Sequence, residues 1–327
     1  MEGRFVLIFA LVNIDPAIEP FLDRLISGDA LEILPLLPSN SIDAVITDPP
    51  YFLDRLDNEW ALQKIRLKKY KRQRVFHLPP GMKFDRRQGK AFYEWFFRVS
   101  ELVYRVLKPG GFFFAFSSPR LYHRLASAVD DAGFAIRDTF LWLYTQSQPK
   151  AMSLMHFIER MELTPEHKSS LKEKLKNWKT PQVKSAYEPI LVAQKPYEGT
   201  FLENILKHGV GLFNTEVRIG ENMFPANVLL IEKSETILDK YFLIERPRGA
   251  EREKIKWHCT PKPIQLCEYL IELSTVKGAV VLDPFVGSGT TALASIRRGR
   301  HYIGIDINPE YIEKAEKRIK QELSTLL

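Results

Sequence analysis

The segment around which this chain is organised reads Ile42-Asp43-Ala44-Val45-Ile46-Thr47-Asp48-Pro49-Pro50-Tyr51. Its apolar first half predicts a buried strand. The two prolines cannot donate to a sheet ladder, and they keep the chain extended, so a helix cannot begin there at once. The strand therefore ends in a rigid segment, residues 48–51, which we call the shelf. It presents the Asp48 carboxylate, free carbonyl groups and the ring of Tyr51. Open α/β sheets bind their ligands at this end of their strands.

The groups on this shelf suit an exocyclic amino group on a planar base. A carboxylate and a carbonyl can accept its two hydrogens, and an aromatic ring can stack on the base. A turn that ends a strand and packs a tyrosine would also explain the same residues. The motif alone leaves both interpretations open.

The length of the chain fits one large α/β domain with an insertion, and its net charge is compatible with a polyanionic partner. The chain has 327 residues, of which 45% are hydrophobic, and a formal net charge of +7. Residues 61–87 hold ten basic side chains and one acidic one, so the excess positive charge is concentrated there. This segment is either a solvated surface or a loop that grips phosphates, and its place directly after the shelf favours the loop. Its predicted DNA contacts are Lys64, Arg66, Lys68, Lys69, Lys71, Arg72 and Arg74.

The two cysteines and the N-terminal residues give little indication of function. Cys259 and Cys267 do not form a paired metal-ligand pattern, and two thiols in so long a chain suit a reducing cytoplasm. We expect no disulfide and no metal. The apolar residues 5–12 are too few to span a bilayer, and we expect a packed N-terminal extension rather than a signal peptide.

Alternating apolar and amphipathic segments predict a doubly wound sheet. Lys108-Pro109-Gly110-Gly111 is a helix stop. Residues 196–256 show little of this rhythm and are expected to lie outside the sheet. The predicted strands are residues 42–46, 112–116, 134–144, 187–193, 278–283 and 301–306. The predicted helices cover residues 92–107, 121–132, 166–177, 264–274 and 309–323, with a further helix that ends at Arg298.

A second motif predicts a nucleoside site. Residues 278–291 combine an apolar strand with the turn Asp283-Pro284-Phe285-Val286-Gly287-Ser288-Gly289, and the next strand ends in Asp306. Glycines let the backbone approach a ligand, and an acid at this position can bind two ribose hydroxyls. The third glycine of the dinucleotide fingerprint and a phosphate loop are both missing from the sequence, which disfavours NAD and ATP.

Together these motifs resemble the amino-methylating DNA methyltransferases of the beta class, in which the Asp-Pro-Pro-Tyr motif precedes the Phe-x-Gly-x-Gly motif. The resemblance extends from Gly28 to the C-terminus. Besides the two motifs it rests on Gly28-Asp29, residues 105–111, Tyr187-Glu188-Pro189-Ile190, residues 258–263 and Gly304-Ile305-Asp306. One departure is Cys259, where the family usually has proline.

The resemblance implies a Rossmann-like methyltransferase fold with permuted motif order, a mostly parallel sheet flanked by helices and an inserted target-recognition region. Residues 1–195 would form the catalytic half, with a basic loop at 52–90. Residues 196–256 would recognise the target, and residues 257–327 would form the cofactor half.

The implied cofactor is S-adenosylmethionine, and the implied substrate is double-stranded DNA. The catalytic residues would be Asp48, Pro49, Pro50 and Tyr51. Asp306 would bind the ribose, Asp29 and Ala30 the adenine edge, and Thr260 and Lys262 the methionine carboxylate, although Asp29 also suits a helix cap. The full cofactor set is Asp29, Ala30, Asp48, Thr260, Lys262, Asp283, Pro284, Phe285, Gly287, Ser288, Gly289, Thr290, Asp306 and Ile307.

Because the motif begins with Asp48, adenine N6 is the expected target, with cytosine N4 as the alternative. An RNA amino methyltransferase, a catalytically silent DNA-binding protein and a nicotinamide-dependent oxidoreductase are the rival functions. A homodimer and a cognate restriction endonuclease are further partners that relatives of this class suggest.

Overall fold

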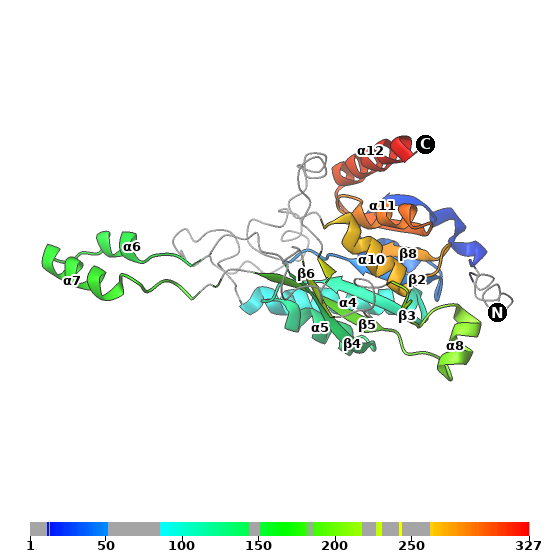
Figure 1. Cartoon of the computed structure of the whole chain (residues 1–327), viewed down its shortest axis with the longest axis horizontal. Coiled ribbons are helices and arrows are strands. Elements are labelled where there is room, and N and C mark those ends of the chain that lie inside the picture. Colours follow the sequence, from blue (N-terminus) through cyan, green and yellow to red (C-terminus); the bar gives the residue numbers. More distant parts are fainter. Residues whose placement is uncertain are drawn as a thin grey trace.

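The computed structural model describes residues 12, 14–51, 86–143, 151–181, 183, 186–217, 227–230, 242–243 and 262–326. Within these residues the strands form one sheet in the order β1-β9-β8-β2-β3-β5-β4-β6-β7. Only β5 runs antiparallel to its neighbours among these described strands. The mostly parallel sheet flanked by helices confirms the predicted fold class (Figure 1).

The strands of the sheet carry the following bounds: β1 Arg24–Ser27, β2 Ile42–Thr47, β3 Leu107–Phe116, β4 Ala135–Leu143, β5 Tyr187–Gln194, β6 Val228–Leu230, β7 Phe242–Leu243, β8 Val280–Asp283 and β9 His301–Asp306. The α-helices are α2 Ala30–Ile33, α4 Arg86–Val106, α5 Tyr122–Asp131, α6 Met155–Glu159, α7 Pro165–Leu175, α8 Phe201–His208, α10 Ile264–Ser274, α11 Thr290–Arg297 and α12 Pro309–Leu326. Two short 3-10 helices, η1 and η2, cover Pro16–Phe21 and Leu34–Leu36.

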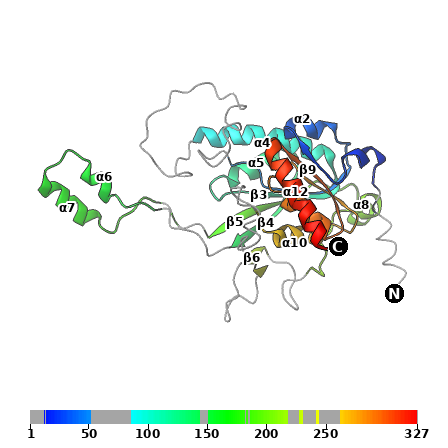
Figure 2. The ribbon, with the colours of Figure 1, turned by 90° about the horizontal axis from the view of Figure 1, so that it is seen from above.

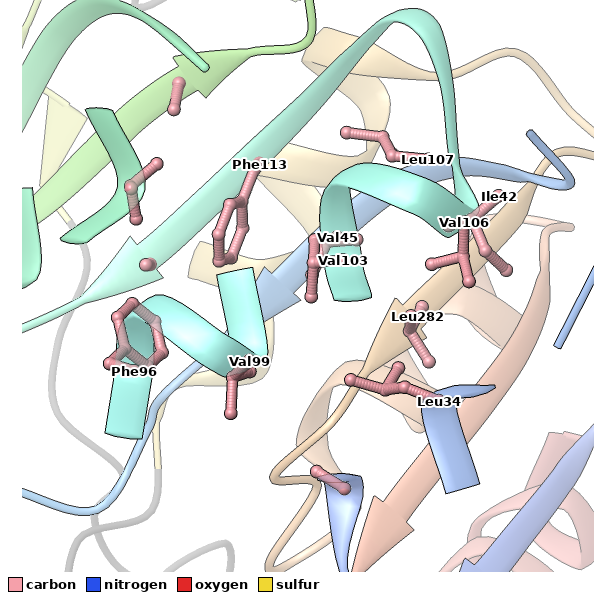
Figure 3. Packing of buried hydrophobic residues seen from close by; sticks show 14 of the residues in the cluster. Leu34, Ile42, Val45, Phe96, Val99, Val103, Val106, Leu107, Phe113 and Leu282 are labelled. Atoms are coloured by element: carbon pink, nitrogen blue, oxygen red, sulfur yellow. The ribbon is translucent and has the colours of Figure 1, made fainter. Parts of the chain in front are cut away.

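Helices cover both faces of the sheet because the central strands are apolar on both sides. Neighbouring residues of one strand enter different cores: Val45 packs with α4 and α5, whereas Ile46 packs with α10 and α11. This is the alternation that extended backbone imposes. Figure 3 shows the first core, in which Phe96 and Val99 of α4 lie against Val45 and Phe113.

The four residues 108–111 end the helix as expected, but they belong to β3 rather than to a loop. The register between β2 and β3 jumps from the pair Ile42 and Leu107 to the pair Ala44 and Phe112, so the extra residues form a bulge. Gly110 has a φ of 83°, which suits glycine. The buried Lys108 ammonium is 2.6 Å from Asp43, and this ion pair fixes the bulge against β2.

The expectation that residues 196–256 lie wholly outside the sheet is wrong. Val228 pairs with Leu141 of β4, and β6 in turn pairs with β7, so both short strands extend the sheet. Strands of two or three residues are too short to show alternation in the sequence; the edge of β4 pairs with β6, and β6 pairs with β7. The remaining described element of this segment is α8, which Thr200 and Glu203 begin as a reciprocal capping box.

Two helices stand apart from the layered body. Helices α6 and α7 pack on each other at the end of a two-chain stalk, and both Figure 1 and Figure 2 show them well away from the sheet. We call residues 151–181 the arm. Among the described residues, no helix combines the length and apolar character needed to cross a bilayer.

Candidate active site

Three aspartates lie along one edge of the sheet because neighbouring parallel strands end there. Asp48 directly follows β2, Asp283 ends β8 and Asp306 ends β9. The pairs Val45 with Leu282 and Asp283 with Gly304 place these strand ends side by side. The edge at which the sequence predicts ligand binding therefore gathers the acids of both motifs.

Both oxygens of Asp48 have partners. The Tyr51 hydroxyl donates to Oδ1 at 2.7 Å, and the Lys262 ammonium donates to Oδ2. Lys262 precedes α10, so residues 214 positions apart in the sequence meet here. Pro49 and Pro50 join Asp48 to Tyr51 as the predicted shelf, and Tyr51 is half-buried against the α4 core.

A second carboxylate also contacts Lys262. Oε2 of Glu188, at the start of β5, is 3.3 Å from the Lys262 Nζ, and the lysine side chain is only 8% exposed. Burial alone would lower the pKa of Lys262, but the charges of Asp48 and Glu188 outweigh it, and the net effect is a raised pKa. The ammonium therefore stays charged between two carboxylates.

Asp283 faces hydrogen-bond donors rather than a cation. Its Oδ1 accepts from the Thr47 hydroxyl at 2.6 Å and from the Phe285 amide at 3.1 Å. Burial raises the pKa of Asp283 to about 6, and hydrogen bonds from Thr47 and Thr291 only partly oppose this. The buried Pro284 follows, and the Phe285 ring lies 5.3 Å from that of Trp95. Asp283 thus shapes the turn and ties it to β2.

The glycine turn after β8 has the backbone that its sequence predicts. Gly287 and Gly289 have φ values of 47° and 76°. A Cβ on Gly289 would lie 3.0 Å from the Cβ of Ala315 in α12. The buried Arg318 of α12 donates to the Ser288 carbonyl at 2.9 Å and to the Thr290 hydroxyl at 3.1 Å. The turn is therefore packed closely from behind.

Asp306 receives two backbone amides. Its Oδ2 accepts from Gly287 at 3.0 Å, and its Oδ1 accepts from Asn308 at 2.8 Å, while burial raises its pKa. An ionised carboxylate offers about four acceptor positions, so these two bonds leave room for ribose hydroxyls. The half-buried Ile307 lies beside it.

Asp29 lies at the same edge. The Gly28 amide donates to the Asp306 carbonyl at 3.0 Å, which brings the end of β1 to the end of β9. Asp29 Oδ1 accepts from Leu31 at 3.0 Å and caps α2, as the capping alternative predicts, and Ala30 is buried in the first turn.

Some predicted residues cannot be placed. Thr260, Cys259 and the seven basic residues 64–74 lie outside the described residues. The predicted contact of Lys262 with a methionine carboxylate stays a prediction. The sequence analysis assigned no role to Glu188 or Arg318, although Glu188 belongs to one of the motifs on which the family resemblance rests. Only the fold brings their charges to this edge, and a lone charged residue gives no signal of that.

Comparison of the chain with known proteins assigns it to a family. The model for the family described as "DNA methylase" matches residues 42–317. The chain is 28% identical over 302 residues to the type II methyltransferase M.HindIII of Haemophilus influenzae, covering 88% of this chain and 92% of that protein.

Two solved structures resemble the fold. The PvuII cytosine-N4-specific DNA methyltransferase has a TM-score of 0.54 at 20% identity, covering 91% of this chain and 89% of that one. TTHA0409 of Thermus thermophilus, described as a "Putative DNA Modification Methylase" and complexed with S-adenosyl-L-methionine, has a TM-score of 0.52 at 22% identity, covering 91% of this chain and 95% of that one.

Proposed function

This chain belongs to the DNA methylase family, and on that premise we propose that it is a site-specific DNA methyltransferase that methylates the N6 amino group of adenine in duplex DNA. The observation that carries the proposal is the arrangement of Asp48. Its carboxylate is held by Tyr51 and Lys262 at the end of β2, next to the strand end that bears the glycine turn.

S-adenosylmethionine is the methyl donor in this proposal, and when bound it supplies a methyl group on a sulfonium that a nucleophile can attack. The residues present fit it. The turn at Gly287 and Gly289 brings bare backbone to the edge, and Asp306 keeps acceptor positions for two hydroxyls. Phe285, Ser288 and Thr290 flank the same turn, and Asp29 and Ala30 would meet the adenine edge.

The amino group of a base is a poor nucleophile because its lone pair is delocalised into the ring. Asp48 and the Pro49 carbonyl would accept its two hydrogens and draw the nitrogen toward a tetrahedral shape, so that the lone pair points at the methyl group. Such alignment acts through proximity and hydrogen bonding, where about 1.36 kcal/mol of transition-state stabilisation corresponds to tenfold in rate.

A cysteine nucleophile is not required by this chemistry. Burial raises the pKa of Cys267 to about 12, so its thiol stays protonated at neutral pH. The described cysteine therefore serves the core of α10, in which it packs with Leu266 and Leu270.

The target base has to leave the duplex stack to reach Asp48, which requires a few kcal/mol. The ring of Tyr51 would stack on the flipped base and return about 1–3 kcal/mol. The basic residues of the 52–90 loop would hold the phosphates, residues 196–256 would read the target sequence, and a homodimer or a cognate endonuclease would act with this chain.

Cytosine N4 is the second candidate, because one structure with this fold is cytosine-N4-specific. The shelf would accept either amino group in the same way. Adenine is preferred because the motif begins with Asp48, whereas related cytosine-N4 enzymes more often begin with serine. An RNA amino methyltransferase and a silent DNA-binding protein are the remaining alternatives.

The test is to incubate the purified chain with labelled S-adenosylmethionine and duplex DNA of mixed sequence, and then to identify the labelled nucleoside by mass. We expect N6-methyldeoxyadenosine. N4-methyldeoxycytidine would keep the mechanism and change the base. Label in RNA alone, or bound cofactor with no transfer to any nucleic acid, would contradict the proposal.

A further inference from the structure

The catalytic cluster contains a carboxylate that the proposed mechanism does not yet use. Glu188 lies at the start of β5, with a side chain that is 18% exposed, and its Oε2 contacts the ammonium of Lys262. The same ammonium binds Asp48. Lys262 therefore links Glu188 to Asp48.

Asp48 and Lys262 alone would form an ion pair of one carboxylate and one ammonium, whose field on a nearby amino group is weak. Glu188 adds a second carboxylate, so among the described residues two carboxylates face one ammonium. Because the lysine and both carboxylates are largely buried, solvent screens their charges less than it would at the surface.

A second carboxylate beside Lys262 matters because of how charge moves in the reaction. The amino nitrogen attacks the methyl carbon, the nitrogen–carbon bond forms, and the sulfur–carbon bond breaks with its electron pair going to sulfur. Positive charge thus passes from sulfur to nitrogen. A proton then leaves the nitrogen for a carboxylate oxygen, and the electron pair of that N–H bond stays on nitrogen.

We propose that Glu188 is a positioning residue of this methyl transfer. It holds the Lys262 ammonium in place and adds a carboxylate whose charge stabilises the positive charge forming on the amino nitrogen. The role rests on the proposed amino methylation and is the same for adenine and cytosine.

Glu188→Gln tests the charge while keeping an acceptor oxygen of the same reach. We expect its single-turnover rate to fall by about tenfold to a hundredfold, which is the scale of losing one electrostatic contact. The KM for DNA should stay within about twofold, because Glu188 contacts no DNA in this scheme. Glu188→Asp keeps the charge and should recover part of the rate.

The matched control is Glu268→Gln. Glu268 is also buried, and its Oε2 is 2.9 Å from Arg298, but it lies on α10 outside the shelf. Removing the charge of Glu268 should lower the midpoint temperature of unfolding without lowering the methyl-transfer rate of the folded enzyme. The rate loss of the double variant Lys262→Met and Glu188→Gln should be smaller than the sum of the two single losses, expressed as free energies, because Glu188 acts through Lys262.

The outcomes are distinct. If the wild type is active and Glu188→Gln transfers the methyl group at the same rate, this role alone would be overturned. The same holds if Glu188→Asp is as slow as Glu188→Gln. A wild type that transfers no methyl group to a base would overturn the proposed function and this role with it.

A different observation concerns the arm, which leaves the sheet at the catalytic edge. β4 ends at Leu143 and β5 begins at Tyr187, and these two residues pair with each other next to Glu188. Ser153 and Lys179 pair across the stalk, and the Met152 amide donates to the Thr180 hydroxyl at 2.8 Å. Figure 2 shows the arm with α6 and α7 lying well away from the sheet.

The arm carries free positive charge at the end of α7. Lys172 binds Glu159, and the Lys168 Nζ donates to the Glu159 carbonyl at 2.8 Å, so these two lysines hold the arm together. Within the described residues, Lys174 and Lys179 have no acidic side chain within 4.0 Å, and the Lys176 Nζ is 4.0 Å from Glu173. Trp178 lies among them and is 69% exposed.

We infer that the arm binds the sugar–phosphate backbone of duplex DNA beside the target base. Exposed lysines with an exposed aromatic ring, on a projection from the edge where the base reacts, complement a polyanion. Because α7 has no buried residue of its own, its lysines do not serve a core.

The variant Lys174→Gln, Lys176→Gln and Lys179→Gln tests this surface. We expect weaker binding of mixed-sequence duplex and a slope of log affinity against log salt that is smaller by up to about 3, from roughly 0.9 per lost phosphate contact. The control replaces Lys314, Lys317 and Lys320 of α12 by Gln and so removes the same amount of charge. Helix α12 packs on β1 and β9 and is not part of the arm.

An unchanged salt slope in the arm variant, or an equal change in the control, would overturn the inference. A changed molecular mass with an unchanged slope would also overturn it, and would make the arm a contact between two copies of the chain.

Discussion

The ends of β2 and β8 lie side by side, yet their aspartates have opposite surroundings. Asp48 faces the Lys262 ammonium and the Tyr51 hydroxyl, and its side chain is 20% exposed. Asp283 is 5% exposed and meets hydroxyls and an amide, with no cation within ion-pair distance among the described residues. The Thr47 hydroxyl donates to Asp283, and Thr47 directly precedes Asp48 in the chain. The two electrostatic environments are therefore only one residue apart along β2.

The difference separates the tasks of two carboxylates on one sheet edge. A carboxylate that has to attract the hydrogens of an amino group benefits from a cation that holds it in place. A carboxylate that shapes a turn needs only hydrogen bonds, and burial can raise its pKa without harm to the turn. Perturbing each aspartate and its partners should therefore affect different properties of the protein.

Replacing Lys262 should affect both rate and stability. Lys262→Met leaves two carboxylates facing each other, so we expect the methyl-transfer rate to fall by about a hundredfold and the free energy of unfolding by about 3–5 kcal/mol. Single-turnover kinetics and chemical denaturation measure these two quantities.

The control for Lys262 is Lys108→Met, which breaks the buried pair with Asp43 beneath the bulge of β3. It should lose stability on a similar scale and keep the transfer rate of the folded enzyme. Equal rates for both variants would show that Lys262 only holds the fold.

Replacing Asp283 should change how stability depends on pH. Its pKa is about 6 in the folded protein against an ordinary value of 3.8, so its contribution is full below the ordinary value and is lost as the pH rises through 6. Asp283→Asn cannot ionise. Relative to wild type, its free energy of unfolding should therefore improve by about 3 kcal/mol between about pH 4 and about pH 7.

Denaturation of both proteins across that pH range measures the difference. Asp283→Asn keeps an oxygen that can accept from Thr47 and Phe285, so the turn should persist. Parallel stability profiles for wild type and variant would contradict the raised pKa of Asp283.

Replacing the second glycine of the turn should have the smallest effect. Gly289→Ala places a Cβ 3.0 Å from Ala315 at a φ of 76°, and we expect a loss of about 1–2 kcal/mol. Gly299→Ala is the control, because Gly299 has a φ of 69° and nothing within 4 Å.

The two glycine variants separate backbone strain from crowding. Gly299→Ala should lose about 1 kcal/mol from the φ alone. Gly289→Ala should lose more and should also weaken cofactor binding, since its turn faces the predicted site. Equal losses in thermal denaturation would mean that the contact with Ala315 does not matter.

Much of the fold could be predicted from local patterns. Helix α10 begins and ends at the predicted Ile264 and Ser274, because an apolar segment follows prolines and gives way to a polar turn. Strand β9 ends at the predicted Asp306. In contrast, α4 begins at Arg86 rather than Phe92, since its polar first turn shows no apolar periodicity.

Long-range contacts were beyond sequence reasoning. The motifs predict that Asp48, Asp283 and Asp306 reach one edge, because parallel strands end together. They do not predict that Lys262 lies between Asp48 and Glu188, since three separate elements supply these residues. The pairing of β6 with β4 likewise depends on a free strand edge and not on the composition of residues 228–230.

The most direct test of the role of Asp48 measures two quantities on the same sample of Asp48→Asn: the binding of labelled S-adenosylmethionine and the transfer of its methyl group to duplex DNA. Asparagine keeps the shape and removes the charge. We predict cofactor affinity within about threefold of wild type and a transfer rate lower by at least about a thousandfold, because the negative charge of the acceptor for the amino group is lost. A variant that loses cofactor binding to the same degree as transfer would make Asp48 a cofactor residue, and a variant that still transfers the methyl group would contradict its catalytic role.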